Sequence, residues 1–164
     1  MSDRVALMQL GQLVQEDAPR LLYENPTSRF AASFLGDMNV ISGRVVSADP
    51  QGLVSVVTAS GNSIRSRAVD LASTPGATVD VTIRPENVQF VGEQLYDKEQ
   101  VNVLSGLMRK STFVGDQVVA HVGIASADWQ VRLRPLDPVP SEGNEVQLLL
   151  PVEACIAFVS DEPA

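Results

Sequence analysis

The sequence predicts a mainly β fold, with two small β-barrel repeats in tandem that follow a short β-hairpin and two helices. Three observations indicate this architecture. Helical periodicity is confined to the first 36 residues, nearly all valines lie from residue 40 onward on short alternating segments, and a sequence pattern of the first half recurs in the second half. With 164 residues, 45% hydrophobic and 20% charged, the chain suits one ordinary domain or two small ones and is unlike a disordered chain.

The N-terminal segment begins with a predicted hairpin. Residues 4–9 and 12–16 are short strand-like runs around a Leu-Gly pair. Asp17 can cap a following helix. Pro19 would then stand in the first turn of that helix, where its missing amide hydrogen costs little. Asn25-Pro26 ends this helix.

A second helix is predicted directly after the first. Thr27 can cap it, Phe30 and Phe34 belong to its apolar face, and Gly36 is a natural stop. Apolar side chains of the hairpin and of this helix need a further partner, so dimerisation, domain swapping or local disorder of the segment is expected.

The remainder of the chain is predicted to consist of short strands separated by turn residues. Such strands with frequent turn signals indicate a barrel or a sandwich. The predicted strands are 40–47, 53–58, 61–67, 77–84, 102–113, 117–124, 129–134 and 144–150, with shorter ones at 88–91 and 155–159.

An internal repeat decides between barrel and sandwich. The matching pairs are 39–43 with 102–106 (offset 63), 76–83 with 143–150 (offset 67), and 90–91 with 158–159 (offset 68). Each unit has five strands and about 55 to 60 residues, which fits an oligonucleotide/oligosaccharide-binding (OB) barrel. The predicted organisation is residues 1–36, then a first OB-like repeat (37–96) and a second (97–164). Gly43 and Gly106 would bend the first strand of each repeat.

Charge and cysteine content limit the possible partners and compartments. The net charge is −8, from 12 basic and 20 acidic residues, which disfavours nucleic acid and anionic lipid as partners. The single cysteine, Cys155, lies in an apolar run and indicates a reducing compartment. No apolar run approaches the length of a membrane span, so a cytoplasmic location without membrane insertion is expected.

The sequence contains no recognisable catalytic machinery. Its one histidine, His121, lies on a predicted strand without a cysteine partner, so it supplies neither a zinc set nor a nucleophile-base pair. A phosphate-binding loop is also absent from the sequence. We therefore expect no catalytic residue, cofactor or metal ligand in this chain.

Four arginines, Arg65, Arg67, Arg132 and Arg134, alternate on two predicted strands. Together with Trp129 they raise the hypothesis of a nucleic-acid or oxyanion site. The acidic net charge and the 5% aromatic content favour a solvated strand face instead.

Several segments resemble one family. Residues 3–8, 23–26 and 30–36 resemble the junction at which the ATPase core of a bacterial ABC importer subunit ends, in the subfamily that serves maltose-type sugars, polyamines and ferric iron. Arg84-Pro85-Glu86 resembles the signature of the transport-associated OB (TOBE) domain, and residues 113–116 resemble its second-half Gly-Asp turn. One departure is Glu16-Asp17-Ala18-Pro19, where relatives commonly carry Gly-Thr-Pro, so a different entry into the first helix is expected.

The resemblance implies a regulatory role. Residues 1–36 would be the C-terminal remnant of the ATPase core, while ATP and magnesium would bind only in the absent part of that core. The expected partners are a second copy of the chain and transmembrane permease subunits, which places the parent protein in the cytoplasm at the inner membrane. The candidate regulatory or interface residues are Arg84, Pro85, Glu86, Phe113, Gly115 and Asp116.

Two alternatives remain open. The Arg-Pro-Glu and Gly-Asp segments can equally be structural turns at strand ends. The chain could also be a free-standing module that binds a small solute of the oxyanion type; an OB-type nucleic-acid binder is not expected.

Overall fold

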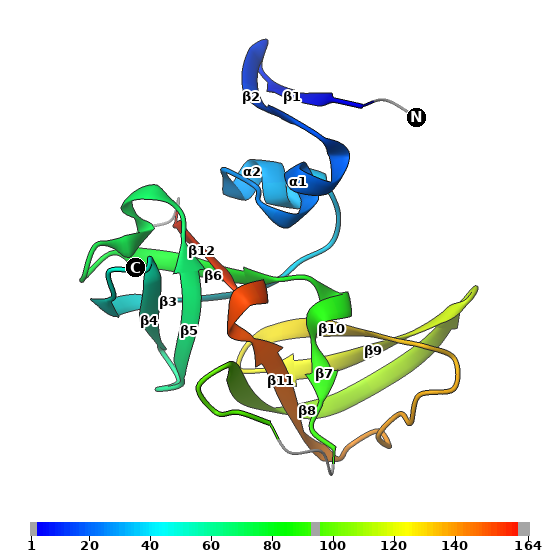
Figure 1. The fold of residues 1–164 in the computed structure, drawn as a ribbon. Helices are drawn as coiled ribbons and strands as arrows, with labels where there is room; N and C mark the ends of the chain where they lie inside the picture. The colour runs from blue at the N-terminus through cyan, green and yellow to red at the C-terminus, as the bar shows by residue number, and fades with distance from the viewer. Residues whose placement is uncertain (1–2, 93–95, 161–164) are drawn as a thin grey trace. The chain divides into compact units, whose positions relative to one another are not determined.

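The computed structural model describes residues 3–92 and 96–160 and divides the chain into two compact units, Met1–Met38 and Asn39–Ala164 (Figure 1). Each unit is described by itself below.

The first unit contains the predicted hairpin and two helices. Its elements are β1 (Val5–Gln9), β2 (Gln12–Asp17), α1 (Pro19–Glu24) and α2 (Arg29–Phe34). The hairpin turn places Leu10 and Gly11 at positive φ (49° and 79°), which a glycine adopts without strain. Among the described residues, no helix is long and apolar enough to cross a bilayer.

The caps of the two helices differ from the predicted ones by one residue. Asp17 belongs to β2 and its carboxylate accepts from the Ala18 amide (2.9 Å), so Ala18 holds the N-cap position of α1. Ser28 caps α2, because its hydroxyl accepts from the Ala31 amide (3.1 Å). Thr27 is engaged elsewhere: its amide and hydroxyl donate to the side-chain oxygen of Gln15 (3.0 and 3.2 Å).

The second unit begins with a closed five-stranded barrel. Its strands, in the order of the ring, are β12 (Ile156–Val159), β5 (Ser63–Ala68), β4 (Leu53–Thr58), β3 (Asn39–Ala48) and β6 (Thr78–Ile83). The alternation of valines predicted its strands, and Val45, Val54, Val56 and Val79 are all buried in the core. The 3-10 helix η1 (Asp70–Ser73) joins β5 to β6.

A second five-stranded sheet follows. Its strands, in spatial order, are β10 (Ala127–Leu133), β9 (Gln117–Ile124), β8 (Val101–Val114), β11 (Glu145–Pro151) and β7 (Gln89–Phe90). Among the described residues β10 and β7 are the two edges of this sheet and do not pair with each other. The predicted strands are thus confirmed, but the second repeat forms an open sheet.

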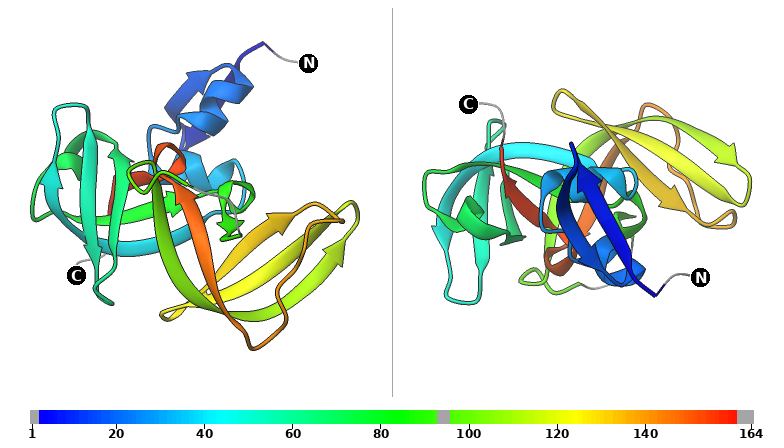
Figure 2. Two further views of the ribbon diagram at one scale, coloured as in Figure 1. Left: turned by 60° about the horizontal axis from the view of Figure 1, so that its bottom comes forward. Right: turned by 90° about the horizontal axis from the view of Figure 1, so that it is seen from above.

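The last strands of the two repeats are exchanged. β12, from the end of the chain, pairs with β5 and β6 of the first barrel, whereas β7, from the end of the first repeat, pairs with β11 of the second sheet. Figures 1 and 2 show red β12 among the green strands of the first barrel and green β7 beside orange β11. A division at residues 96 and 97 therefore separates the two repeats along the chain but not the two sheets.

The repeat predicted from the sequence has a structural counterpart with slightly different offsets. Strands β3 and β8 carry bulges at equivalent places, after Val45 and after Met108, which keeps the offset of 63. Phe90 pairs with Leu148 as Ala157 pairs with Val81, so the last strands align at offset 67 rather than 68. The predicted repeat aligned the Phe-Val pairs at residues 90–91 and 158–159. In the structure, equivalent residues are those that occupy the same position in the strand pairing, and these are shifted by one residue.

Two asparagines join the sheets through matching hydrogen bonds. Asn39 accepts from the Gln130 amide (2.8 Å) and donates to the Gln130 carbonyl (2.7 Å). Asn102 does the same with Arg65, at 2.7 and 2.8 Å. Each asparagine lies at the start of the first strand of one repeat, as the first residue of β3 or the second of β8, and binds the third strand of the other repeat. Gln130 is therefore the equivalent of Arg65.

Gly43 and Gly106 are required by close packing between neighbouring strands. A Cβ on Gly43 would lie 2.5 Å from Val56 Cγ1 and 2.8 Å from the Val57 carbonyl oxygen, and a Cβ on Gly106 would meet β9 equally closely. The bulges lie two residues farther along each strand. The two glycines therefore allow β3 and β8 to approach their neighbouring strands closely and to bend, in line with the predicted bend.

Candidate functional site

The open seam of the second sheet contains a cavity of about 1020 Å³. Its lining comes from η2 (Pro85–Asn87), from the segment around β7, from the turn between β8 and β9, and from β10 with the loop that follows it. The polar members of the lining are Glu86, Gln89, Asp116, Gln117, Arg132, Arg134 and Asp137. A cavity of this size with convergent charged groups is the leading candidate site.

The seam is open because the closing hydrogen bonds of the first barrel are replaced. In the first barrel the amides of Arg67 and Val69 donate to the Cys155 and Ala157 carbonyls, at 3.0 Å each. Arg134 occupies the place of Val69 in the second sheet, and its amide donates to the Asp137 carboxylate instead (2.9 Å). The Asp137 carboxylate, from the loop after β10, thus binds the Arg134 amide that would otherwise help to close a second barrel.

The Arg-Pro-Glu segment forms the entrance to η2. Arg84 is buried (8% exposed) with extended backbone, and the Asn87 amide donates to its carbonyl (3.0 Å). Pro85 is buried at the first position of the 3-10 helix, where a missing amide hydrogen costs little. Glu86 reaches the seam, with a carboxylate oxygen 3.5 Å from Arg132 Nη1.

The Gly-Asp segment forms the turn between β8 and β9. Gly115 adopts φ +64°, a conformation that favours glycine. Phe113 is 64% exposed and is not among the residues that line the cavity. Asp116 does line it. Of the six candidate residues, the structure therefore brings Glu86 and Asp116 to one cavity, while Arg84, Pro85, Phe113 and Gly115 are not part of the lining.

The arginines were predicted to form a solvated strand face, and this interpretation needs refinement. Arg65 and Arg67 donate to the backbone carbonyls of Glu99 (2.6 Å) and Glu153 (3.0 Å). Arg132 and Arg134 line the cavity. The alternation of arginines along each strand indicates that they share one face of the sheet. Only the fold shows that Arg132 and Arg134 border a cavity.

Asp137 is a charged residue of the candidate site that sequence reasoning missed. Its carboxylate binds the Arg134 guanidinium at 2.9 and 3.1 Å as well as the Arg134 amide. These bonds hold the pKa of Asp137 below its usual value and raise the pKa of Arg134. The sequence signal was Arg-Pro-Leu-Asp-Pro, since an aspartate between prolines is typical of a loop that bonds to its own backbone.

Two further titratable side chains lie outside the cavity. His121 Nδ1 is 2.7 Å from an Asp128 carboxylate oxygen, across the pair of strands β9 and β10. The Cys155 thiol is buried, which raises its pKa to about 12. Within residues 3–92 and 96–160, no group of three His, Cys, Asp or Glu side chains is placed to hold a metal ion.

Fold and cavity together define a tandem OB-type barrel protein with exchanged end strands. Residues 81–158 match the family model of the TOBE domain. This stretch runs from β6 to β12, so its two ends pair with each other in the first barrel. These residues thus form a TOBE domain, and the chain as a whole is similar to part of the ATP-binding proteins of ABC importers.

The curated relatives are ATP-binding proteins of polyamine import. The chain is 30% identical over 163 residues to the putrescine transport ATP-binding protein PotG of Escherichia coli, which covers 96% of this chain and 42% of that protein. It is 32% identical over 117 residues to the spermidine/putrescine import ATP-binding protein PotA of Thermotoga maritima, covering 71% of this chain and 31% of the relative. The chain thus spans less than half the length of these relatives.

A solved structure shows the same fold. The cytoplasmic molybdate-binding protein ModG, with molybdate bound, superposes with a TM-score of 0.60 over 74% of this chain and 96% of the ModG chain. The sequence identity is 14%, so the likeness concerns the fold alone.

Proposed function

We propose that this chain is the regulatory region of the ATP-binding subunit of a polyamine importer. The alignment with PotG over 163 residues carries this proposal, because it extends through the hairpin and helices as well as both sheets. The region would hold two ATP-binding subunits together while their catalytic parts open and close, which raises the effective concentration of each for the other. Its own surface supplies contacts rather than chemistry.

The remaining parts of the proposal concern partners and location. Catalysis, ATP and magnesium would belong to the part of the subunit that corresponds to the relatives' length outside the match. The parent protein would work in the cytoplasm, bound to the permease subunits at the inner membrane and paired with a second copy of itself. Neither nucleic acid nor direct membrane insertion belongs to this role, in keeping with the net charge of −8.

A chimera tests the proposal. The matching portion of Escherichia coli PotG would be replaced by this chain, and putrescine uptake would be measured in cells that lack their own PotG. We expect the chimera to restore uptake, whereas PotG truncated before this portion should not. The level of each protein in the cell is the control.

Two results would contradict the proposal. One is a chimera that accumulates and hydrolyses ATP normally without restoring uptake of any polyamine. The other is tight one-to-one binding of molybdate or a similar oxyanion to the chain alone, measured by calorimetry, which would favour a free-standing solute-binding module.

A further inference from the structure

The second half of β8 has a strand edge that the described part of the chain leaves unpaired. β11 pairs with residues 101–107 of β8, and two further bonds join Met108 to Gly143 and Asn144 (2.9 Å each). Residues 109–114 pair with β9 on one side only, and all six are exposed. An unpaired strand edge presents backbone donors and acceptors in the spacing that another strand requires.

Two residues of this edge direct their backbone groups away from β9. Gly115 (φ +64°) begins a two-residue turn, so Val114 and Gln117 form the hydrogen-bonded pair that closes the hairpin. Hydrogen-bonded and non-hydrogen-bonded pairs alternate along antiparallel strands, so the amides and carbonyls of Ser111 and Phe113 point outward. Within residues 3–92 and 96–160, no side chain or backbone group binds them.

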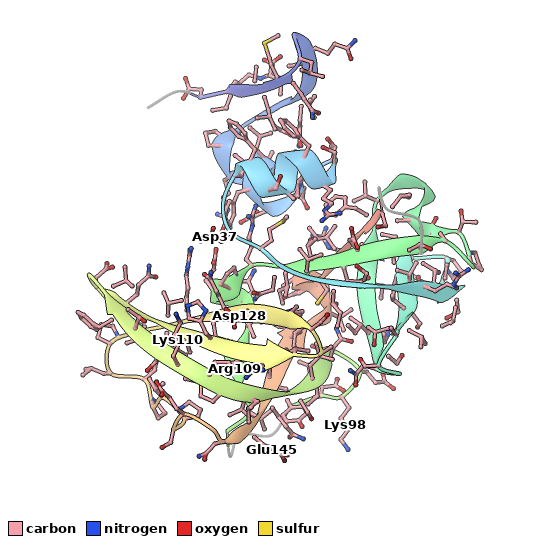
Figure 3. The ribbon with its side chains drawn as sticks, turned by 180° about the vertical axis from the view of Figure 1, so that it is seen from behind. Asp37, Lys98, Arg109, Lys110, Asp128 and Glu145 are labelled. Carbon is pink, nitrogen blue, oxygen red and sulfur yellow. The ribbon has the colours of Figure 1, made fainter. Side chains whose placement is uncertain are left out.

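Two cations lie on one face of this part of the sheet. Arg109 is the extra residue of the β8 bulge, and its guanidinium lies against Gly123 of β9, where a Cβ would be 2.6 Å from Nε. Lys110 pairs in register with His121. Asp128 of β10 is opposite Gly123, but its carboxylate binds His121 (2.7 Å) (Figure 3). Among the described residues, the Arg109 and Lys110 side chains therefore have no ion pair or hydrogen bond, in a chain of net charge −8.

The opposite face of the edge offers an apolar contact. Side chains alternate along a strand, so Phe113 lies on the other face from Lys110, in register with the buried Val118. Phe113 is nevertheless 64% exposed. An aromatic side chain in a strand favours an apolar neighbour on the next strand.

The charges favour an acidic strand over other occupants of this edge. Cations on an edge discourage pairing with neutral or basic strands, but they attract a strand that carries carboxylates. Two copies of this chain paired through the same edge would bring four cations into one small interface. A nucleic acid could use the charges, but it has no row of backbone amides to pair with a strand edge.

We propose that residues 109–114 of β8 dock a short, extended, acidic segment of a partner protein, which adds to this edge as a strand. Its carboxylates would lie beside Lys110, with Arg109 adding to the positive potential, and an apolar side chain would contact Phe113 on the other face. Backbone bonds to Ser111 and Phe113 would supply affinity, and the cations would supply specificity. The proposal does not depend on the polyamine importer, because it concerns a surface of this chain alone.

Calorimetry with the whole chain tests the proposal. The probe is a blocked peptide of about seven residues in which glutamate and valine alternate, long enough to span the edge. We expect saturable one-to-one binding. A lysine-valine peptide of the same length should bind at least about tenfold more weakly, because it places like charges together.

Methylated peptides test the strand pairing. Amides of an extended peptide point alternately to its two sides, so methyl groups on the glutamate amides or on the valine amides block opposite edges. One of these two peptides should lose binding by about tenfold or more, whereas the other should bind nearly as well as the parent peptide.

Matched variants locate the site on the protein. Lys110→Gln should weaken binding of the glutamate peptide about two- to fivefold, as expected for the loss of one exposed ion pair. Lys98→Gln removes the same charge from the other lysine of the chain, which precedes β8, and should leave the affinity unchanged (Figure 3). Phe113→Ala should also weaken binding about two- to fivefold. Exchange of the Ser111 and Phe113 amides should slow when the peptide is bound.

Several outcomes would overturn the proposal. They are the absence of saturable binding, equal affinity for the glutamate and lysine peptides, equal affinity for the two methylated peptides, and equal effects of Lys110→Gln and Lys98→Gln. Displacement of the glutamate peptide by a single-stranded oligonucleotide at similar concentrations would assign the edge to a nucleic acid instead. A chain that sediments as a dimer with its Ser111 and Phe113 amides already protected would assign the edge to a second copy.

Discussion

Asn39 and Asn102 each replace a neighbouring strand with a single side chain. Asn102 is 6% exposed and satisfies both the amide and the carbonyl of Arg65. Asn102→Ala would leave both groups without that partner, so we expect the free energy of unfolding to fall by about 2–3 kcal/mol. Asn39→Ala should have a similar effect through Gln130. Urea denaturation of the two variants measures these changes.

Asn144→Ala is the control for these variants, because Asn144 is exposed and contributes its backbone carbonyl to a bond with Met108. Its effect should stay below about 0.5 kcal/mol. Losses for Asn39→Ala and Asn102→Ala as small as that would show that water replaces the asparagine bonds at no cost.

Gly106 and Gly123 provide a matched pair for testing the close approach of β8 and β9. A Cβ on Gly106 would lie 2.6 Å from Val122 Cγ1 and 2.9 Å from the Gly123 carbonyl oxygen. A Cβ on Gly123 would meet the Arg109 guanidinium, which a flexible side chain can move away. We expect Gly106→Ala to cost about 2 kcal/mol and Gly123→Ala less than about 1 kcal/mol, measured by thermal or urea unfolding. Equal costs would argue against the close approach.

At the level of residues, the sequence predicted part of the candidate site. Glu86 and Asp116 were found through motifs, and both line the cavity. Arg132 and Arg134 were weighed as part of an oxyanion or nucleic-acid site and then assigned to a solvated strand face. Their role depends on a missing pairing between β7 and β10, which is a long-range property that no local pattern contains.

At the level of elements, period-2 alternation of valines and turn residues located the strands to within a few positions. The partners of the short strands β7 and β12 could not be predicted in this way. Each directly follows the strands of its own repeat, and the pattern that makes a strand says which face is buried but not which edge it joins. The assumption that each repeat keeps its own last strand was natural, and the observed pairing is the reverse.

The loop after β10 allows a prediction about Asp137. Asp137→Ala removes the acceptor of the Arg134 amide, so exchange of that amide with solvent should become faster. Asp137→Asn keeps a side-chain oxygen but loses the ion pair, so most of the protection should remain. Amide hydrogen exchange followed by NMR measures both variants. Unchanged protection in Asp137→Ala would show that another group accepts from this amide.

The same bond should respond to acid. The Arg134 guanidinium lowers the pKa of Asp137 in the folded chain, so the carboxylate contributes its full stabilisation above the unfolded pKa of about 4. This contribution is lost as the pH falls through the lower, folded pKa. Protection of the Arg134 amide, corrected for intrinsic exchange, should therefore be constant from neutral pH to about pH 5 and decline below about pH 4. A decline centred near neutral pH would contradict the assignment to Asp137.

For the whole molecule, strand exchange means that neither repeat is complete alone. Residues 39–96 lack β12, which closes the first barrel, and residues 97–160 lack β7 and the Arg65 backbone that Asn102 binds. We expect each segment, produced separately, to be largely unfolded by circular dichroism and NMR. Mixed in equal amounts, the segments should assemble into one folded complex.

Cys155 reports this assembly directly. Its thiol is fully buried next to the start of β12 and bonds to Asn102, and its burial raises the thiol pKa to about 12. In segment 97–160 alone it should react with a thiol reagent at pH 8 as fast as an unfolded cysteine, because an exposed thiol has a pKa near 8.5. Addition of segment 39–96 should suppress the reaction strongly, whereas segment 39–96 carrying Gly43→Ala, which disturbs β3 and β4, should suppress it less. Protection of Cys155 without the first segment would show that the second repeat folds by itself, and exchange of the end strands would then not be what holds the two sheets together.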